Sequence, residues 1–274
     1  MEQAAEGLLE RVRAVVPLIR GSAGEAERQR KPDDEVIEAL KATGVFRSFV
    51  PKRFGGYEIG MDSYVDVGIC VSEACASTGW ITTFYMEHCW QFTSFCAETQ
   101  AEVFGEQGFV LAPGSVNPNA GEAKPCDGGF SLSGHWRFSS GIVHAQWVLV
   151  NAGVVGKRSP MPRKFLVRPH QIDVIDTWHV DGMAGTGSHD IVAKDVFVPE
   201  RHASLPLGSP GDGVAVRGPV DHEGWCKSIY FDDPNGLQLE YCHLTREFVA
   251  ADAVPQVRFR RDSGRKLPAE KRPA

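Results

Sequence analysis

The chain has 274 residues, of which 42% are hydrophobic and 23% charged, and its formal net charge is −6 at pH 7. These values exclude a fibrous or wholly disordered protein, and the negative charge argues against a general nucleic-acid binder. The seven cysteines form neither a CxxC pair nor a disulfide framework. The amino terminus does not resemble a signal peptide, and no apolar run is long enough to span a membrane. We therefore expect a cytoplasmic protein of one or two domains, with no membrane or nucleic-acid partner.

Helical patterns begin the chain. The apolar stripe over residues 8–19 predicts a first helix, which the glycines within 21–24 should end. Proline and aspartates at 31–34 predict the start of a second helix, which Gly44 should stop. The apolar run 45–50 is typical of a short strand.

A third helix is predicted over 64–75, with Asp62 as its cap. The small residues at 77–79 should break it, and a segment unusually rich in aromatic residues follows at 80–95. His88 lies within this segment. It is either a core histidine or a residue that contacts a ligand, and the core is the default interpretation.

After Phe109 the composition changes to glycine, proline and β-branched residues, which predicts an antiparallel β domain. The expected strands are 130–138, 147–154, 164–167, 172–175 and 191–198.

The first long predicted strand ends in residues that could bind a ligand. Residues 130–138 alternate between apolar and polar, and Ser139, Ser140 and Gly141 then supply two hydroxyls and a permissive backbone. Hydroxyls beside large aromatic residues suit a flat heteroaromatic ligand. The alternative is a Ser-Gly turn with Trp136 in the core.

A glycine-rich segment at 182–188 lacks the spacing of a dinucleotide-binding loop. It is either a turn where the hydroxyls of Thr186 and Ser188 meet a ligand or an ordinary strand connection.

The carboxy-terminal part contains two short strands around an Asp-Pro-Asn-Gly turn. The sequence thus divides into a helical domain (1–107), a β domain (108–206), a linker (207–217), a β fragment (218–256) and a tail that we expect to be disordered (257–274).

Five motifs follow one another in the order, and at about the spacing, of a known family. They are Val50-Pro51 with Phe54-Gly55-Gly56, Ser77-Thr78-Gly79-Trp80, His88 with Trp90, the segment from Trp136 to Trp147, and Gly185-Thr186-Gly187-Ser188 running to Val196-Phe197-Val198-Pro199. From about residue 12 to 206, the chain resembles the oxygenase component of two-component flavin-dependent monooxygenases, a phenol-hydroxylating branch of the acyl-CoA dehydrogenase fold.

The resemblance implies an α+β fold. An amino-terminal helical domain precedes an antiparallel β-barrel-like domain of acyl-CoA dehydrogenase type, without the carboxy-terminal helical bundle and with a carboxy-terminal β-hairpin fragment in its place. It also implies reduced FMN or FAD delivered by a flavin reductase, with O₂ and a small phenolic substrate. A homo-oligomer stays open.

Site residues follow from the same resemblance. His88 would approach the substrate hydroxyl and favour the phenolate, with Trp90 also at the substrate, and Ser140 would act with His88 in catalysis. Ala184 stands where the family usually has an arginine. The residues expected at the flavin are Ser115, Trp136, Ser139, Ser140, Trp147, Gly185, Thr186 and Ser188.

Residues 214–254 resemble the end of a vicinal-oxygen-chelate module, as in glyoxalases and extradiol dioxygenases. Glu240 would be the metal ligand there, with His222 and Tyr230 farther from the metal. A catalytic metal needs about three protein ligands, so we expect none. The chain looks like two gene fragments joined near residues 208–218. Alternatives are an acyl-CoA dehydrogenase-like flavoenzyme, an inactive fusion remnant, or a metal-dependent glyoxalase- or dioxygenase-like protein.

Overall fold

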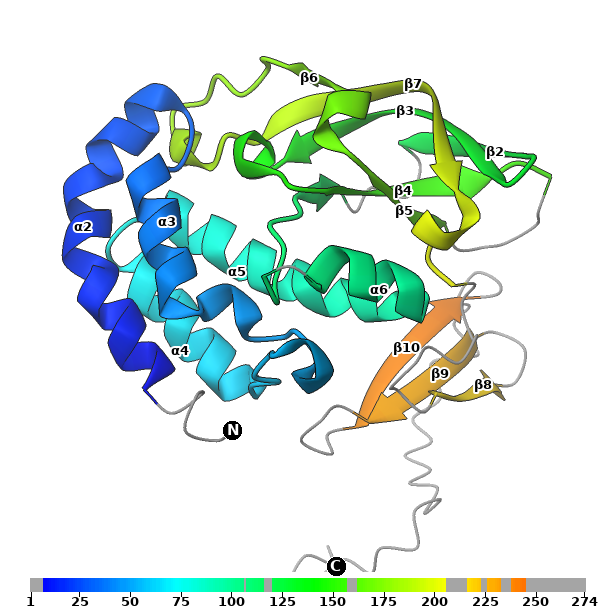
Figure 1. Ribbon diagram of the computed structural model, residues 1–274, viewed down its shortest axis with the longest axis horizontal. Coiled ribbons are helices and arrows are strands. Elements are labelled where there is room, and N and C mark those ends of the chain that lie inside the picture. The colour runs from blue at the N-terminus through cyan, green and yellow to red at the C-terminus, as the bar shows by residue number, and fades with distance from the viewer. Residues whose placement is uncertain are drawn as a thin grey trace, which may run out of the picture. The chain divides into compact units, whose positions relative to one another are not determined.

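The structure is a computed structural model that shows helices first and strands after them (Figure 1). It describes residues 7–105, 107–115, 120–156 and 162–205, and the backbone alone of 216–222, 226–232 and 238–244. The helices are α2 (Leu8–Gln29), α3 (Asp34–Thr43), α4 (Met61–Ser72), α5 (Ala76–Gln91) and α6 (Ala97–Phe104).

The second predicted helix, α3, is confirmed at both ends. The Asp33 carboxylate accepts a hydrogen bond from the Glu35 N–H at 2.9 Å, and Gly44 ends the helix with a φ of 81°. The apolar run after Gly44 is not a strand. Its first residues form the 3₁₀ turn η1 (Val45–Arg47), in which Val45 and Phe46 are fully buried. A one-turn 3₁₀ segment buries these two apolar side chains without a strand partner.

Two helix boundaries were predicted wrongly because glycine was interpreted as a breaker. Helix α2 continues through Gly21 and Gly24 to Gln29, where Ala26 is buried against Gly185. Helix α5 includes the small residues at 77–79, which were expected to end a helix. A Cβ at Gly79 would lie 2.1 Å from the Ser72 Oγ, so this glycine lets α5 approach α4 closely. Tertiary packing therefore outweighs local propensity at both sites.

The cap of α4 also differs from the prediction. The helix begins at Met61 after Gly60, and Asp62 lies inside its first turn. A carboxylate there still suits the positive end of the helix dipole.

The β domain is a curled sheet of seven strands. Their order is β1-β4-β2-β3-β7-β6, with β5 paired to β4. Antiparallel pairing dominates, as expected, but β1 and β2 each run parallel to β4. The strands are β1 (Gly114–Ser115), β2 (Gly121–Cys126), β3 (Gly129–Ser139), β4 (Val148–Val154), β5 (Arg163–Val167), β6 (Asp173–Ile175) and β7 (His189–Pro199).

Each part has its own core. Phe46, Tyr85 and Phe92 are among the buried residues of the helical core, whereas Trp136 and Phe165 belong to that of the sheet. Between the two lies the 3₁₀ turn η6 (Ala184–Thr186), which packs against α2 and α5 (Figure 1).

Hydrogen bonds from α2 hold η6 in place. The Glu27 carboxylate accepts from the Ser77 hydroxyl and from the Ala184 N–H, each at 2.9 Å. Arg30, at the end of α2, pairs with Asp176. One helix end therefore ties the start of α5 to the glycine-rich turn.

A separate three-stranded sheet has the order β10-β9-β8. Its strands are β8 (Val216–His222), β9 (Cys226–Asp232) and β10 (Gln238–Leu244). Strands β9 and β10 fall near the two strands predicted around the Asp-Pro-Asn-Gly turn, the hairpin itself stays a prediction, and β8 was not foreseen. The tail at 257–274, most of the linker at 207–217 and the Asp-Pro-Asn-Gly turn lie outside the described residues, and the domain boundaries stay predictions. Among the described helices, none is long and apolar enough to cross a bilayer.

Candidate functional site

Three rings follow one another along helix α5. Trp80, Phe84 and His88 stand four residues apart, so they share one face of the helix. The rings of Trp80 and Phe84 are stacked with centroids 6.0 Å apart and planes at 17°, and the Phe84 and His88 centroids are 4.2 Å apart. Eight residues of helix place the two ends of the row about 12 Å apart.

A chain of hydroxyls meets the first ring. The Trp80 indole N–H donates to the Ser140 Oγ at 3.2 Å, and Ser140 and Ser188 lie 2.7 Å apart. Ser188 is also 2.7 Å from the Thr186 hydroxyl. The neighbouring Ser139 hydroxyl is buried and has no hydrogen-bond partner within the described residues. The structure thus brings three of the predicted cofactor-binding residues, Ser140, Thr186 and Ser188, together beside Trp80.

Phe138 adds an aromatic face that the sequence did not indicate. Its φ of 63° is rare for a bulky residue, and its side chain is 54% exposed. The ring meets Trp178 edge-on at 5.8 Å, and the Arg137 guanidinium lies 4.9 Å from its centroid. The register of β3 against β7 shifts between Trp136 and Ser139, which turns Phe138 outward. The only signal in the sequence was the end of alternation before the serines.

The far end of the ring row is His88. Its side chain is 1% exposed, and its Nδ1 bonds to the Ala112 carbonyl oxygen. The Nε2 atom is buried without a hydrogen-bond partner in the described part of the chain, 3.6 Å from a Glu87 carboxylate oxygen. Burial lowers the pKa of His88, so the imidazole is neutral near pH 7.

Trp136 is enclosed in the core of the sheet. It is 0% exposed, and its indole N–H donates to the Asn151 carbonyl at 2.8 Å. A Cβ at Gly121 or Gly134 would collide with the Trp136 ring. This is the alternative interpretation of the segment, in which the tryptophan is a packing residue, and Trp136 has no exposed face for a cofactor.

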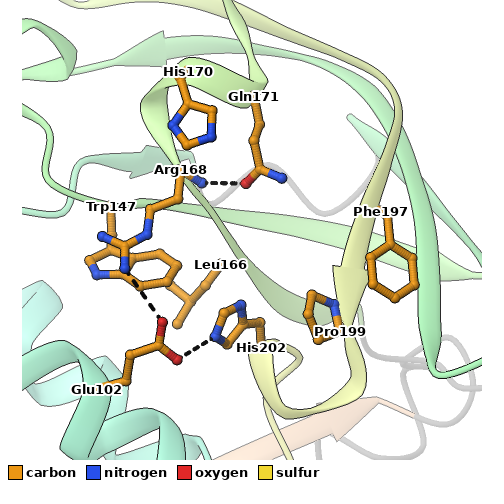
Figure 2. Close-up of a pocket in the computed structure, with 9 residues that line it drawn as sticks. All are labelled: Glu102, Trp147, Leu166, Arg168, His170, Gln171, Phe197, Pro199 and His202. Carbon is orange, nitrogen blue, oxygen red and sulfur yellow. Dashed lines mark hydrogen bonds and ion pairs between the residues drawn. The ribbon is translucent and has the colours of Figure 1, made fainter.

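Trp147 lies in a different place from the serines. It lines a pocket of about 230 Å³ together with Arg168 and Glu102 (Figure 2). The Arg168 guanidinium lies 3.5 Å from the centroid of the Trp147 ring. Glu102 pairs with both Arg168 and His202 at this pocket. Trp147 contacts a cation and a histidine here, so its predicted role at the flavin has no support from this geometry.

The other predicted site residues also lie in different places relative to the row of rings. Ser115 is buried in β1 next to Gly114, where a Cβ would lie 3.1 Å from the His88 ring. It therefore lies at the His88 end of the row. Trp90, 42% exposed, is two residues from His88 and so faces a different side of α5. Gly185 packs against α2 and the Ser77 side chain.

Nothing in the described structure forms a metal centre. Within the described residues, no three His, Cys, Asp or Glu side chains are grouped so that they could hold an ion. The side chain of Glu240 lies outside what the structure describes, so its role stays a prediction.

Comparisons with known proteins bear on the whole arrangement. A "Pigment production hydroxylase" of Rhodococcus sp. (strain ATCC 21145) is 40% identical over 215 residues, which are 77% of this chain and 55% of the relative. The "FADH(2)-dependent resorcinol hydroxylase, oxygenase component" of Rhizobium sp. (strain MTP-10005) is 40% identical over 207 residues, 74% of this chain and 50% of the relative. The homologues of this chain include oxygenase components of flavin-dependent monooxygenases. The resemblance to this family is thereby confirmed.

A solved structure agrees with these homologues. XiaF from Streptomyces sp., in complex with FADH2 and glycerol, superposes with a TM-score of 0.68 at 31% identity, over 74% of this chain and 51% of that chain. No family model matches the chain. The chain spans about half the length of the curated relatives that it matches. The match to these proteins covers about three quarters of this chain.

Proposed function

We propose that this chain carries the flavin-binding residues, called the flavin seat below, of a flavin-dependent monooxygenase that hydroxylates a phenolic substrate with O₂. It also carries His88, the histidine that would contact the substrate. Reduced FMN or FAD would come from a separate flavin reductase. The observation that supports this most is the row of rings on α5. Serine hydroxyls lie at one end, and at the other is the His88 Nε2, which has no hydrogen-bond partner among the described residues.

The residues at the serine end fit an isoalloxazine ring. Phe138 and Trp80 are each about half exposed, so both present an apolar face. The Thr186 hydroxyl donates to the Met183 carbonyl, so Ser188 donates to Thr186 and Ser140 donates to Ser188. Ser140 would turn its hydrogen toward an acceptor at the edge of a heteroaromatic ring, and the buried Ser139 hydroxyl lacks a partner among the described residues. These residues would hold the flavin, whereas Trp136 and Trp147 are left out of the proposed seat.

Reduced flavin, when bound, would supply the electrons that activate O₂. The chain's own residues would orient the ring and prepare the substrate. His88 can accept the phenol proton at Nε2, because Nδ1 is already engaged with the Ala112 carbonyl. A phenolate is a stronger nucleophile than a phenol, so this transfer favours hydroxylation of the ring.

Binding of reduced flavin tests the seat. The chain would be titrated anaerobically with reduced FMN and with reduced FAD, and the flavin that binds more tightly would identify the cofactor. We expect Ser140→Ala to weaken binding about threefold to tenfold through the loss of one hydrogen bond. Ser63→Ala, an exposed serine in the first turn of α4, serves as the matched control. Equal binding by Ser140→Ala and the wild type would refute the seat.

Hydroxylation tests the reaction. With a flavin reductase, NADH and O₂, the hydroxylated products of resorcinol and 4-hydroxyphenylacetate would be measured together with H₂O₂. We expect His88→Gln to retain flavin binding and to lose product relative to H₂O₂. If His88→Gln lost flavin binding and product equally, His88 would be a packing residue.

A further inference from the structure

Glu87 stands beside the reactive end of His88. One of its carboxylate oxygens lies 3.6 Å from the His88 Nε2, and the other accepts a hydrogen bond from the Gln91 side-chain amide at 2.6 Å. The Glu87 side chain is 39% exposed, while His88 is buried. The carboxylate is thus held by the next turn of α5 at the one imidazole nitrogen that has no partner among the described residues.

The hydrogen bond at the other nitrogen fixes the tautomer. A carbonyl oxygen can only accept, so the Nδ1 that bonds to Ala112 must carry the hydrogen. In neutral His88 the Nε2 is then a bare lone pair that faces the Glu87 carboxylate. Two acceptors face each other until a proton arrives at Nε2. After it arrives, an imidazolium lies beside a carboxylate, and the repulsion becomes attraction.

A second charge acts in the opposite sense. Lys164 of β5 is half-buried, and its ammonium disfavours a positive charge on His88 while Glu87 favours it. Burial lowers the pKa of Lys164. Two other titratable groups lie within electrostatic reach of Glu87, and burial keeps both neutral: it raises the pKa of Tyr64, and it raises that of Cys89 to about 12. The Glu87 carboxylate and the Lys164 ammonium therefore act on the pKa of His88 in opposite directions.

We propose that Glu87 is a positioning residue for His88, which stabilises the proton that Nε2 takes from a phenol. The O–H bond of the phenol breaks, an N–H bond forms at Nε2, and a phenolate and an imidazolium result. This role rests on the proposed function. It assigns a task to Glu87, which the flavin seat does not use.

The titration of His88 tests the coupling without any flavin. The protein would be labelled at histidine with ¹³C, and the His88 signal would be assigned by its loss in His88→Gln. We expect Glu87→Gln to move the titration of His88 to lower pH and Lys164→Gln to move it to higher pH. Glu98→Gln on α6, whose carboxylate is exposed, is the matched control and should leave it unchanged.

Rescue separates charge from packing. Glu87→Asp keeps the carboxylate and should restore part of the shift. If Glu87→Gln left the titration in place, or moved it in the same direction as Lys164→Gln, the proposal would be overturned.

A phenol that reports its own ionisation tests the consequence. Bound 4-nitrophenol absorbs as phenolate only after it gives up its proton. We expect the phenolate-to-phenol ratio of the bound probe to fall about twofold to fivefold in Glu87→Gln, since a partly exposed pair contributes modestly. An unchanged ratio would contradict the role. Failure of the wild type to bind reduced flavin, with these shifts intact, would instead count against the proposed function alone.

Discussion

The left-handed backbone at Phe138 makes a prediction in which stability and binding separate. A residue with a Cβ costs about 1–2 kcal/mol at such a φ, whereas glycine adopts it freely. Phe138→Ala and Phe138→Gly both remove the ring and its contacts with Trp178 and Arg137. They differ in the Cβ that has to sit at a φ of 63°. We therefore expect Phe138→Gly to be more stable than Phe138→Ala by about 1 kcal/mol, after the entropy that glycine adds to the unfolded chain.

Urea unfolding measures this difference, and thermal unfolding should show it as about 2–4 °C. Both variants should bind reduced flavin more weakly than the wild type, because the exposed aromatic face is gone. If Phe138→Ala were as stable as Phe138→Gly, the backbone at this site would not be strained. If both variants bound reduced flavin as the wild type does, the ring would not be part of the seat.

Three further predictions concern the surroundings of the site. Trp136→Ala should lower the free energy of unfolding by about 3–5 kcal/mol, because it empties a core position; a loss under 1 kcal/mol in urea unfolding would contradict the packing role. Glu27→Ala should cost about 2 kcal/mol and speed amide exchange at Ala184, because the Ala184 N–H and the Ser77 hydroxyl lose their acceptor; unchanged exchange would refute that contact. The wild type should lose stability as the pH falls below about 6.5, since the unfolded chain takes up the proton that buried His88 resists, and His88→Gln should flatten this dependence; equal slopes in both proteins would contradict it.

Much of the fold could be predicted because periodic patterns span whole elements. The alternation over 130–138 gave β3, and the cap at Asp33 with the stop at Gly44 gave α3. Glycine misled where its role is packing. Gly79 stands inside α5 because Ser72 leaves no room for a side chain, and no local pattern reveals a neighbour from another helix.

Part of the site could be anticipated in the same way. The hydroxyls of Ser140, Thr186 and Ser188 do come together, although 46 residues separate the first two along the sequence. The alternation over 130–138 places Trp136 and Phe138 on the same face of the strand, so it could not predict that only Phe138 faces outward. The register shift after Trp136 buries that ring and exposes Phe138, and a bulge depends on the partner strand as much as on the strand itself.

The hydrogen bond from Trp80 to Ser140 joins a residue of the helical part to one at the end of a β strand. A ligand that contacts both Trp80 and Ser140 would link the helical core to the core of the sheet. Its binding energy would then resist their separation, so the protein should melt as one body when loaded and more readily in two steps when empty. In such a protein the cofactor also stabilises the packing of the helical part against the sheet. Loss of flavin would therefore first weaken the contact between these two parts.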